Sequence, residues 1–209
     1  MPKITSIKQQ KDKNRVNVYL DGKFGFGLDL ENFVKLGLKV EQELTNEQID
    51  EIVRKSEHQK VLDKLLNFAT FRLRSIHEVR VWLRRKKIPE DMHEDLFNTL
   101  KRLELINDEK FAKWWIDQRM SFRPKGKKAL KFELLKKGID RKIIDAAFGE
   151  VVIDEKSIAL ELLKKRKSKW EKLEEMEAKQ KMYSYLGARG FDWELIKNAV
   201  DEYLKLKGY

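Results

Sequence analysis

Apolar residues recur at helical spacing from about Glu57 to the end of the chain. Residues three and four positions apart share one face of a helix, so each such stripe predicts an amphipathic helix. Residues 57–106 contain three stripes: Leu62, Leu65, Leu66 and Ala69; Val79, Trp82 and Leu83; and Leu96, Phe97, Leu100 and Leu103. The pattern therefore predicts a unit of three helices.

The same pattern returns in residues 107–153, whose middle stripe is Leu130, Leu134 and Leu135, and in residues 154–209. In each unit a small residue precedes a leucine by eight positions: Ser75 and Leu83, Gly126 and Leu134, Ala178 and Leu186. The three leucines are 51 and 52 residues apart. A period of this size predicts a tandem array of helical repeats, which forms an extended binding surface more often than an enzyme pocket.

Residues 1–56 follow a different pattern. Apolar and polar residues alternate in 3–8 and 15–20, and Asp21-Gly22 is typical of a tight hairpin turn. A short helix is expected over 29–36, and Thr45 with Gln48 forms a capping-box pattern that begins another. The predicted fold is mainly α, with three three-helix repeats (57–106, 107–153 and 154–209) after a small β-hairpin and helix appendage (1–56).

The joint between the second and third helices of a repeat has its own signature. Gly138 and Gly190 are placed to adopt the left-handed conformation that ends a helix. Asp140 and Asp192 follow as predicted caps of the next helix. In the first repeat Lys87 replaces the glycine and a proline follows two positions later, so this turn is expected to differ.

Composition excludes several classes of function. The chain has no cysteine, and its three histidines have no metal-ligand spacing. It contains no P-loop, no Gly-x-Ser-x-Gly and no His-Glu-x-x-His sequence. No apolar run approaches the length of a membrane span. We therefore expect a cytoplasmic monomer without enzymatic activity, cofactor, metal or membrane partner.

The net charge of +11 is distributed unevenly. Successive segments alternate in sign: 60–88 carries +7, 89–117 carries −4, 118–142 carries +8, 143–163 carries −4 and 164–183 carries +4. Stacked repeats would bring the basic segments into register as a stripe for a polyanion or an acidic protein surface. The competing interpretation is a solvated basic face with favourable charges at helix C-termini.

The candidate binding residues come from the two strongest basic segments. They are Arg72, Arg74, Arg80, Arg84, Arg85, Lys87, Arg123, Lys125, Lys127, Lys128, Lys131 and Lys137. Trp114 and Trp170 lie off the apolar stripes, so we assign them to a partner surface, with core packing as the alternative.

The paired helices also raise the possibility of a stand-alone DNA-binding regulator of helix-turn-helix type. Against it, the segment after the first turn contains Glu90, Asp91, Glu94 and Asp95, which phosphates would repel. A general protein scaffold is a third alternative.

The repeat motifs resemble the RecX family of regulatory proteins. They are Ser75-x-x-Glu78-Val79-x-x-x-Leu83-x-x-Lys86, Asn107-Asp108-Glu109-Lys110-Phe111-Ala112, Glu133-Leu134-x-x-Lys137-Gly138-Ile139 and Tyr185-Leu186-x-x-Arg189-Gly190-Phe191. The likeness spans residues 60–205, and the strand-rich N-terminus is similar to the extension of longer members. Lys87 and Asn107 depart from the usual glycine and acidic residue.

The resemblance implies a non-enzymatic regulator of homologous recombination, DNA repair and the SOS response. Such proteins bind the RecA recombinase filament on single-stranded DNA, in its helical groove, and restrain strand exchange, ATP hydrolysis and co-protease activity. Weak and unselective binding to single-stranded DNA, and to duplex DNA, is also expected. The family supplies no catalytic residues.

Overall fold

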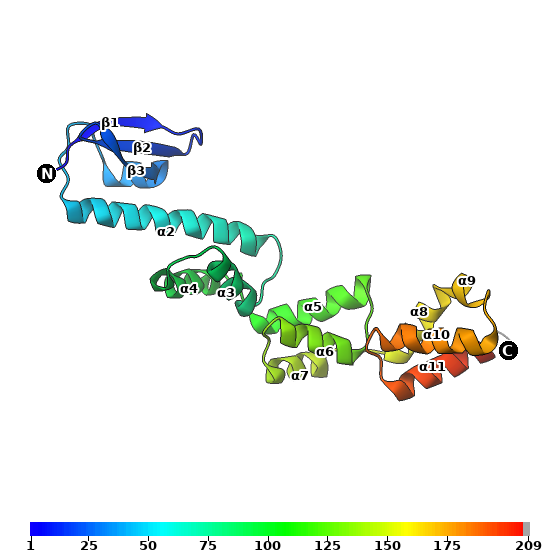
Figure 1. The fold of residues 1–209 in the computed structure, drawn as a ribbon. Coiled ribbons are helices and arrows are strands. Elements are labelled where there is room, and N and C mark those ends of the chain that lie inside the picture. The colour runs from blue at the N-terminus through cyan, green and yellow to red at the C-terminus, as the bar shows by residue number, and fades with distance from the viewer. Residues whose placement is uncertain (207–209) are drawn as a thin grey trace. The chain divides into compact units, whose positions relative to one another are not determined.

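The computed structural model describes residues 1–206 of the chain, which divide into two compact units. The first unit contains residues 1–71 and 88–97, and the second contains residues 72–87 and the chain from Asn98 onward. The fold is mostly helical with a small N-terminal sheet (Figure 1), as the sequence predicts. No helix among the described residues is both long enough and apolar enough to cross a bilayer.

The first unit begins with an antiparallel sheet of three strands in the order β1-β2-β3. The strands are β1 (Ile4–Gln9), β2 (Arg15–Leu20) and β3 (Lys23–Asp29). Asp21 and Gly22 both have positive φ, of 47° and 78°, which is the geometry of a tight hairpin turn. The predicted Asp-Gly hairpin is therefore confirmed.

Two helices cover one face of this sheet. Asp29 caps α1 (Leu30–Leu36), and the capping box of Thr45 and Gln48 begins α2 (Asn46–Thr70). Side chains of β2 and β3 form a core with those of the first half of α2: Val16, Val18, Phe26, Leu28 and Ile52 are buried. The 3-10 turn η1 (Glu90–Met92) leads into α4 (His93–Arg102).

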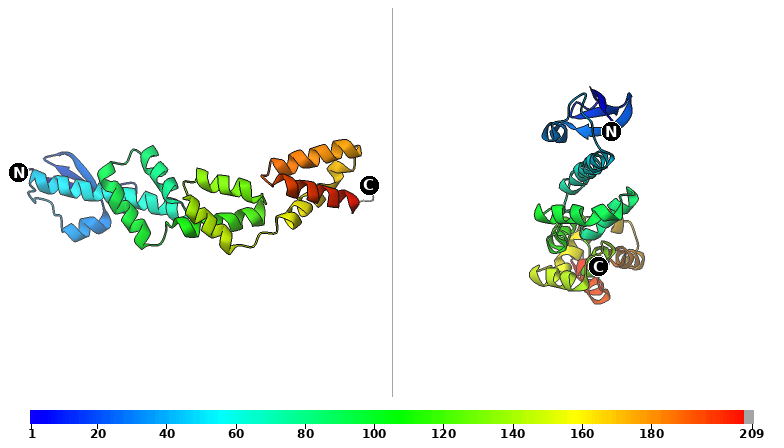
Figure 2. Two further views of the ribbon diagram at one scale, coloured as in Figure 1. Left: turned by 90° about the horizontal axis from the view of Figure 1, so that it is seen from below. Right: turned by 90° about the vertical axis from the view of Figure 1, so that its left-hand side faces the viewer.

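Among its described residues the second unit has helices and no strand, and it includes the last five residues of α4. Its helices are α3 (Ile76–Arg85), α5 (Asp108–Phe122), α6 (Lys127–Lys136), α7 (Arg141–Glu150), α8 (Glu155–Lys164), α9 (Lys167–Trp170), α10 (Glu175–Gly187) and α11 (Trp193–Lys205). Figure 2 shows α5–α7 and α8–α11 as two successive groups. Each group has its own core: Phe111, Leu134 and Ile144 are buried in the first, and Leu163, Leu186 and Ile196 in the second.

Two apolar positions depart from the predicted stripes. Leu103 is 49% exposed because α4 ends at Arg102, one residue earlier. Leu135 is 40% exposed because Leu130 and Leu134 fill the core side of α6 and turn Leu135 toward solvent. The stripe on α6 is thus narrower than its sequence indicates.

The joint after the second helix is left-handed in all three repeats. Gly138 and Gly190 have φ of 76° and 73°, and Lys87 has φ of 54°. The first turn differs from the other two, as expected, but only after Lys87, where Pro89 precedes a 3-10 turn. Lys87 itself keeps the conformation that a glycine would adopt, at the steric cost of a Cβ atom.

Contacts with the preceding repeat explain why glycine occupies the other two joints. A Cβ atom on Gly138 would lie 2.4 Å from Cβ of His77, and one on Gly190 would lie 2.4 Å from Cβ of Ala129. His77 is in the first turn of α3, and Ala129 is in the first turn of α6. No repeat precedes the first one, so no equivalent helix start excludes a side chain at Lys87.

Candidate functional site

The start of α3 is held by the repeat that follows it. The hydroxyl of Ser75, the N-cap, accepts from the backbone N–H of Glu78 at 3.1 Å and donates to the carbonyl of Lys137 at 2.8 Å. The N–H of Ile76 donates to Oδ1 of Asp108, the first residue of α5, at 2.9 Å. Of the free N–H groups at this helix end, that of Glu78 is thus satisfied by Ser75 and that of Ile76 by the second repeat.

The start of α6 is held in the same way by the third repeat. The N–H of Gly126 donates to the carbonyl of Arg189 at 3.0 Å, and that of Lys127 donates to Oε1 of Glu155 at 2.8 Å. Glu155 is the first residue of α8, as Asp108 is of α5. Equivalent joints thus give the basic helices α3 and α6 the same relation to the repeat that follows each.

A carboxylate reinforces the first joint. Glu78 accepts a bidentate pair of hydrogen bonds from Arg72, at 2.8 and 2.9 Å, and one from Nζ of Lys137 at 2.6 Å. Burial alone would raise the pKa of the Glu78 carboxyl, but these hydrogen bonds outweigh it and lower the pKa to about 2. Lys137 belongs to the second repeat, so this ion pair joins the two repeats.

A second carboxylate organises the surface of the second repeat. Glu133 accepts from Nε1 of Trp115 at 2.9 Å, from Arg119 at 2.7 Å and from Lys125 at 2.5 Å. Burial opposes ionisation of Glu133, yet these donors lower its pKa below the ordinary value. Two cations lie close to the Trp115 ring: the guanidinium of Arg119 is 4.4 Å and Nζ of Lys137 is 5.0 Å from the ring centroid.

Several sequence candidates therefore have partners within the protein. Arg72 and Lys137 bind Glu78, Lys125 binds Glu133, and Lys131 lies 2.6 Å from Asp145. Arg74 is half-buried, and burial lowers its pKa. These side chains stabilise the repeats and their joints.

The two tryptophan candidates differ in exposure. Trp114 is half-buried against Phe111, with ring centroids 5.7 Å apart. Trp170 is only 6% exposed, and its Nε1 donates to the carbonyl of Leu163 at 3.0 Å. Assigning Trp170 to the surface was wrong, because α9 folds its indole into the core of the third repeat.

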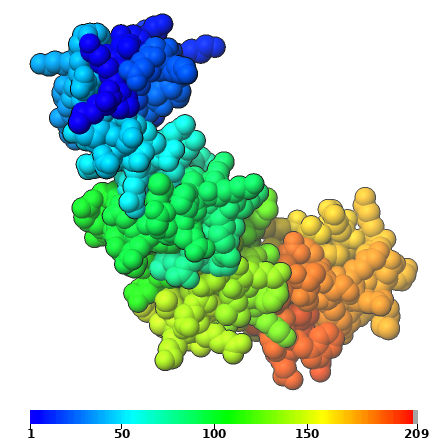
Figure 3. Space-filling view, turned by 60° about the vertical axis from the view of Figure 1, so that its left-hand side comes forward, coloured from blue at the N-terminus to red at the C-terminus, as the bar shows by residue number. Residues whose placement is uncertain are grey.

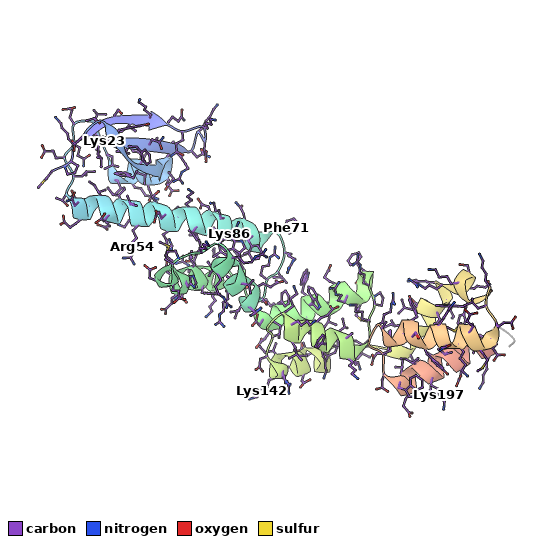
Figure 4. The ribbon with its side chains drawn as sticks, viewed as in Figure 1. Lys23, Arg54, Phe71, Lys86, Lys142 and Lys197 are labelled. Carbon is purple, nitrogen blue, oxygen red and sulfur yellow. The ribbon has the colours of Figure 1, made fainter. Side chains whose placement is uncertain are left out.

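Other candidates face solvent. Arg84, Arg85, Lys87, Arg123 and Lys128 are exposed and have no ion-pair partner among residues 1–206. Arg80 is also exposed, and Lys127 is half-buried. Lys86, labelled in Figure 4, extends the same basic run at the C-terminal end of α3.

The structure adds an apolar component that the charge pattern does not reveal. The outer face of α6 consists of Lys128, Lys131, Phe132, Leu135 and Lys136, all exposed. Phe132 is 57% exposed, with Nζ of Lys136 4.5 Å from its ring centroid. A shallow groove continues from this face to Gly187, Ala188 and Phe191 of the third repeat. The missed signal was the spacing of Lys128, Phe132 and Leu135, which places them opposite the core leucines of α6.

The described residues contain no cluster of three or more histidine or acidic side chains arranged to hold a metal ion. The surface offers free cations, a cation-aromatic cluster and a partly apolar helix face. Such a surface can bind phosphates or acidic side chains and can bury apolar groups of a partner.

Family models match most of the chain. They describe the RecX N-terminal domain over residues 2–45, the second three-helix domain of RecX over residues 107–147 and the third three-helix domain of RecX over residues 154–200. The first of these three-helix matches contains α5, α6 and most of α7, and the second contains α8 to most of α11, so both glycine joints are included.

Full-length relatives and solved structures carry the same name. "Regulatory protein RecX" of Bacillus licheniformis is 32% identical over 204 residues, which cover 97% of this chain and 78% of the relative. The protein of that name from Clostridium perfringens is also 32% identical, with 96% and 95% covered. A crystal structure of regulatory protein RecX has a TM-score of 0.67 at 25% identity, covering 96% of this chain and all of the other. That of RecX from Lactobacillus salivarius has a TM-score of 0.60 at 28% identity, covering 70% and 96%.

Proposed function

The chain belongs to the RecX family of regulatory proteins, and from this premise we propose that it is a non-enzymatic inhibitor of the RecA recombinase. It binds the RecA filament assembled on single-stranded DNA and lies in the filament groove. The observation that carries the proposal is that the same contacts with the following repeat hold the start of α3 and the start of α6, so that the two basic helices are presented in equivalent ways.

A RecA filament on DNA presents both phosphates and protein side chains. The free cations at the end of α3 suit phosphates or acidic residues, because their charge is not neutralised within the described part of the chain. The outer face of α6 adds exposed apolar surface at Phe132 and Leu135, which suits a protein partner. A protein bound along the groove restrains strand exchange, ATP hydrolysis and co-protease activity by limiting changes in the filament.

The test is ATP hydrolysis by the cognate RecA on single-stranded DNA with increasing amounts of this protein. Wild-type protein is expected to inhibit below equimolar ratios. Replacing Arg84, Arg85 and Lys128 by Glu should raise the half-inhibitory concentration by roughly tenfold or more, because each reversal removes an ion contact and adds repulsion. Absence of inhibition by wild-type protein at every ratio and salt concentration would refute the proposal.

The matched control reverses three exposed cations elsewhere: Arg141, Lys142 and Lys197, of which the last two are labelled in Figure 4. The net charge changes by the same amount, so a general electrostatic effect would weaken both variants equally. We expect the control to stay within about threefold of wild type, since these residues lie on α7 and α11.

One observation favours the DNA-binding alternative. α7 is the helix after the joint in the second repeat, and its first turn contains Arg141 and Lys142 with no acidic residue. A recognition helix would use these two side chains to contact a duplex. Duplex binding about a thousandfold selective for one sequence, and lost in the Arg141, Lys142 and Lys197 variant, would favour that function.

A further inference from the structure

One face of the N-terminal sheet carries aromatic and basic side chains. Val16 and Val18 of β2 point into the core, so Asn17 and Tyr19 point to the opposite side, away from the buried cluster. Their cross-strand partners complete what we call the outer sheet face: Ser6, Lys8, Asn17, Tyr19, Phe24 and Gly27. The sheet belongs to the N-terminal part of the chain, whose residues are drawn in blue in Figure 3.

The two aromatic rings form a platform on this face. Tyr19 and Phe24 are paired across β2 and β3, with ring centroids 6.1 Å apart and an edge-to-face angle of 85°. Nζ of Lys8 lies 5.1 Å from the centroid of the Tyr19 ring. Phe24 is 61% exposed although it is large and apolar, so the fold leaves most of its ring in contact with water.

Basic residues without an ion-pair partner lie at both ends of this face. Lys11 and Lys13 in the β1–β2 loop and Lys23 at the start of β3, labelled in Figure 4, are exposed and have no ion-pair partner among the described residues. The acidic residues of this region accept backbone N–H groups: Asp12 from Asn14, Asp21 from Lys3 and Asp29 from Asn32. Their carboxylates are thus engaged in turns and a helix cap.

We propose that the outer sheet face is a binding site for single-stranded nucleic acid. Unpaired bases expose ring faces that stack on aromatic side chains, and the phosphates that join them are neutralised by lysines beside the platform. Beside the platform the Gln10 side chain lies over Gly27, where its amide donates to Oδ1 of Asn17 at 2.7 Å. A duplex is not the matching ligand, because its bases are already stacked on each other.

The test measures binding of the full-length protein to a fluorescently labelled oligothymidylate by anisotropy, without RecA. Phe24→Ala is expected to raise the Kd about tenfold, because stacking of one base is lost. Phe24→Tyr keeps the ring and should bind within about twofold of wild type. The matched control is Val34→Ala on α1, an apolar residue of the same unit that is 69% exposed but lies outside the platform.

An abasic oligonucleotide of the same length separates stacking from charge. It keeps the phosphates but has no base rings, so Phe24→Ala should weaken binding of this ligand by less than about twofold. Lys8→Ala should weaken binding of both oligonucleotides, and Lys39→Ala is its control. The inference is overturned if wild-type protein does not bind oligothymidylate or if Phe24→Ala and Val34→Ala have the same Kd. It is also overturned if Phe24→Ala weakens binding of oligothymidylate and of the abasic oligonucleotide equally. Because RecA is absent, the result is independent of the proposed inhibition.

Discussion

Glu78 is a largely buried carboxylate, its side chain 13% exposed, and it accepts hydrogen bonds from cations on both sides of a repeat joint. Glu78→Gln keeps the shape but leaves Arg72 and Lys137 without their counter-charge. We expect a loss of about 3 kcal/mol in the free energy of unfolding. All five tryptophans belong to the second unit, so urea unfolding followed by tryptophan fluorescence reports on that unit. The control is Glu177→Gln in the same unit, which removes an exposed helix pair with Lys181 and should cost about 0.5 kcal/mol at most.

Measuring wild type and Glu78→Gln at several pH values tests whether the negative charge of Glu78 causes the difference in stability. The folded-state pKa of Glu78 is lowered from 4.5 to about 2, so its contribution is present above pH 4.5 and is lost as the pH falls toward 2. The difference between wild type and Glu78→Gln should therefore shrink between pH 6 and pH 2. A difference that does not change over this range would mean that packing, rather than ionisation, makes the contribution.

At the scale of the elements, the left-handed joints differ in what surrounds them. A Cβ atom at Gly138 meets both a positive φ of 76° and the side chain of His77 at 2.4 Å. Lys87 already carries a side chain at φ 54°. The two positions share a conformation, but steric exclusion by a preceding repeat applies to Gly138.

We therefore predict opposite effects at the two joints. Gly138→Ala should destabilise the second unit by about 2–4 kcal/mol, because the α3 contact must shift and the backbone is strained. Lys87→Gly should be neutral or stabilising by up to about 1 kcal/mol, because it relieves the left-handed strain. Tryptophan-monitored urea unfolding measures both. Equal losses of stability in the two variants, or a larger loss in Lys87→Gly, would contradict this account of the joints.

The elements themselves were predictable because their signals are local. Helical stripes, the Asp21-Gly22 turn and the joint glycines follow from spacing within a few residues. The ion pairs were not predictable, since Glu78 and Lys137 are 59 residues apart and meet only through the joint. Trp170 was assigned to the surface because the short helix α9, which buries it, has no periodic stripe of its own.

At the scale of the whole molecule, the net charge is +11, and the basic residues fall into two groups. Those of the first group form ion pairs within the protein, and those of the second group do not. Only the second group can release counterions from a phosphate backbone on binding. Replacing Arg84, Arg85 and Lys128 by Ala should lower the slope of log affinity against log salt for RecA filaments by roughly 2. The measurement is anisotropy of labelled protein between about 50 and 200 mM salt.

The Arg141, Lys142 and Lys197 variant, with Ala at each position, is the control and should keep the wild-type slope. If the slope is also unchanged in the first variant while the affinity falls, those cations contact acidic protein side chains. If neither affinity nor slope changes, the α3 and α6 surface does not contact the filament.

The repeated joint also bears on how such a chain changes length during evolution. In α3 and α6 the first N–H group donates to a carboxylate of the next module, and the residue with that carboxylate begins the first helix of that module in both joints. An in-frame duplication or deletion of one 51-residue module would therefore bring a ready-made interface with it. Growth by whole modules needs no new complementary surfaces, so gene duplication can adjust the length of the surface that one molecule presents to a partner.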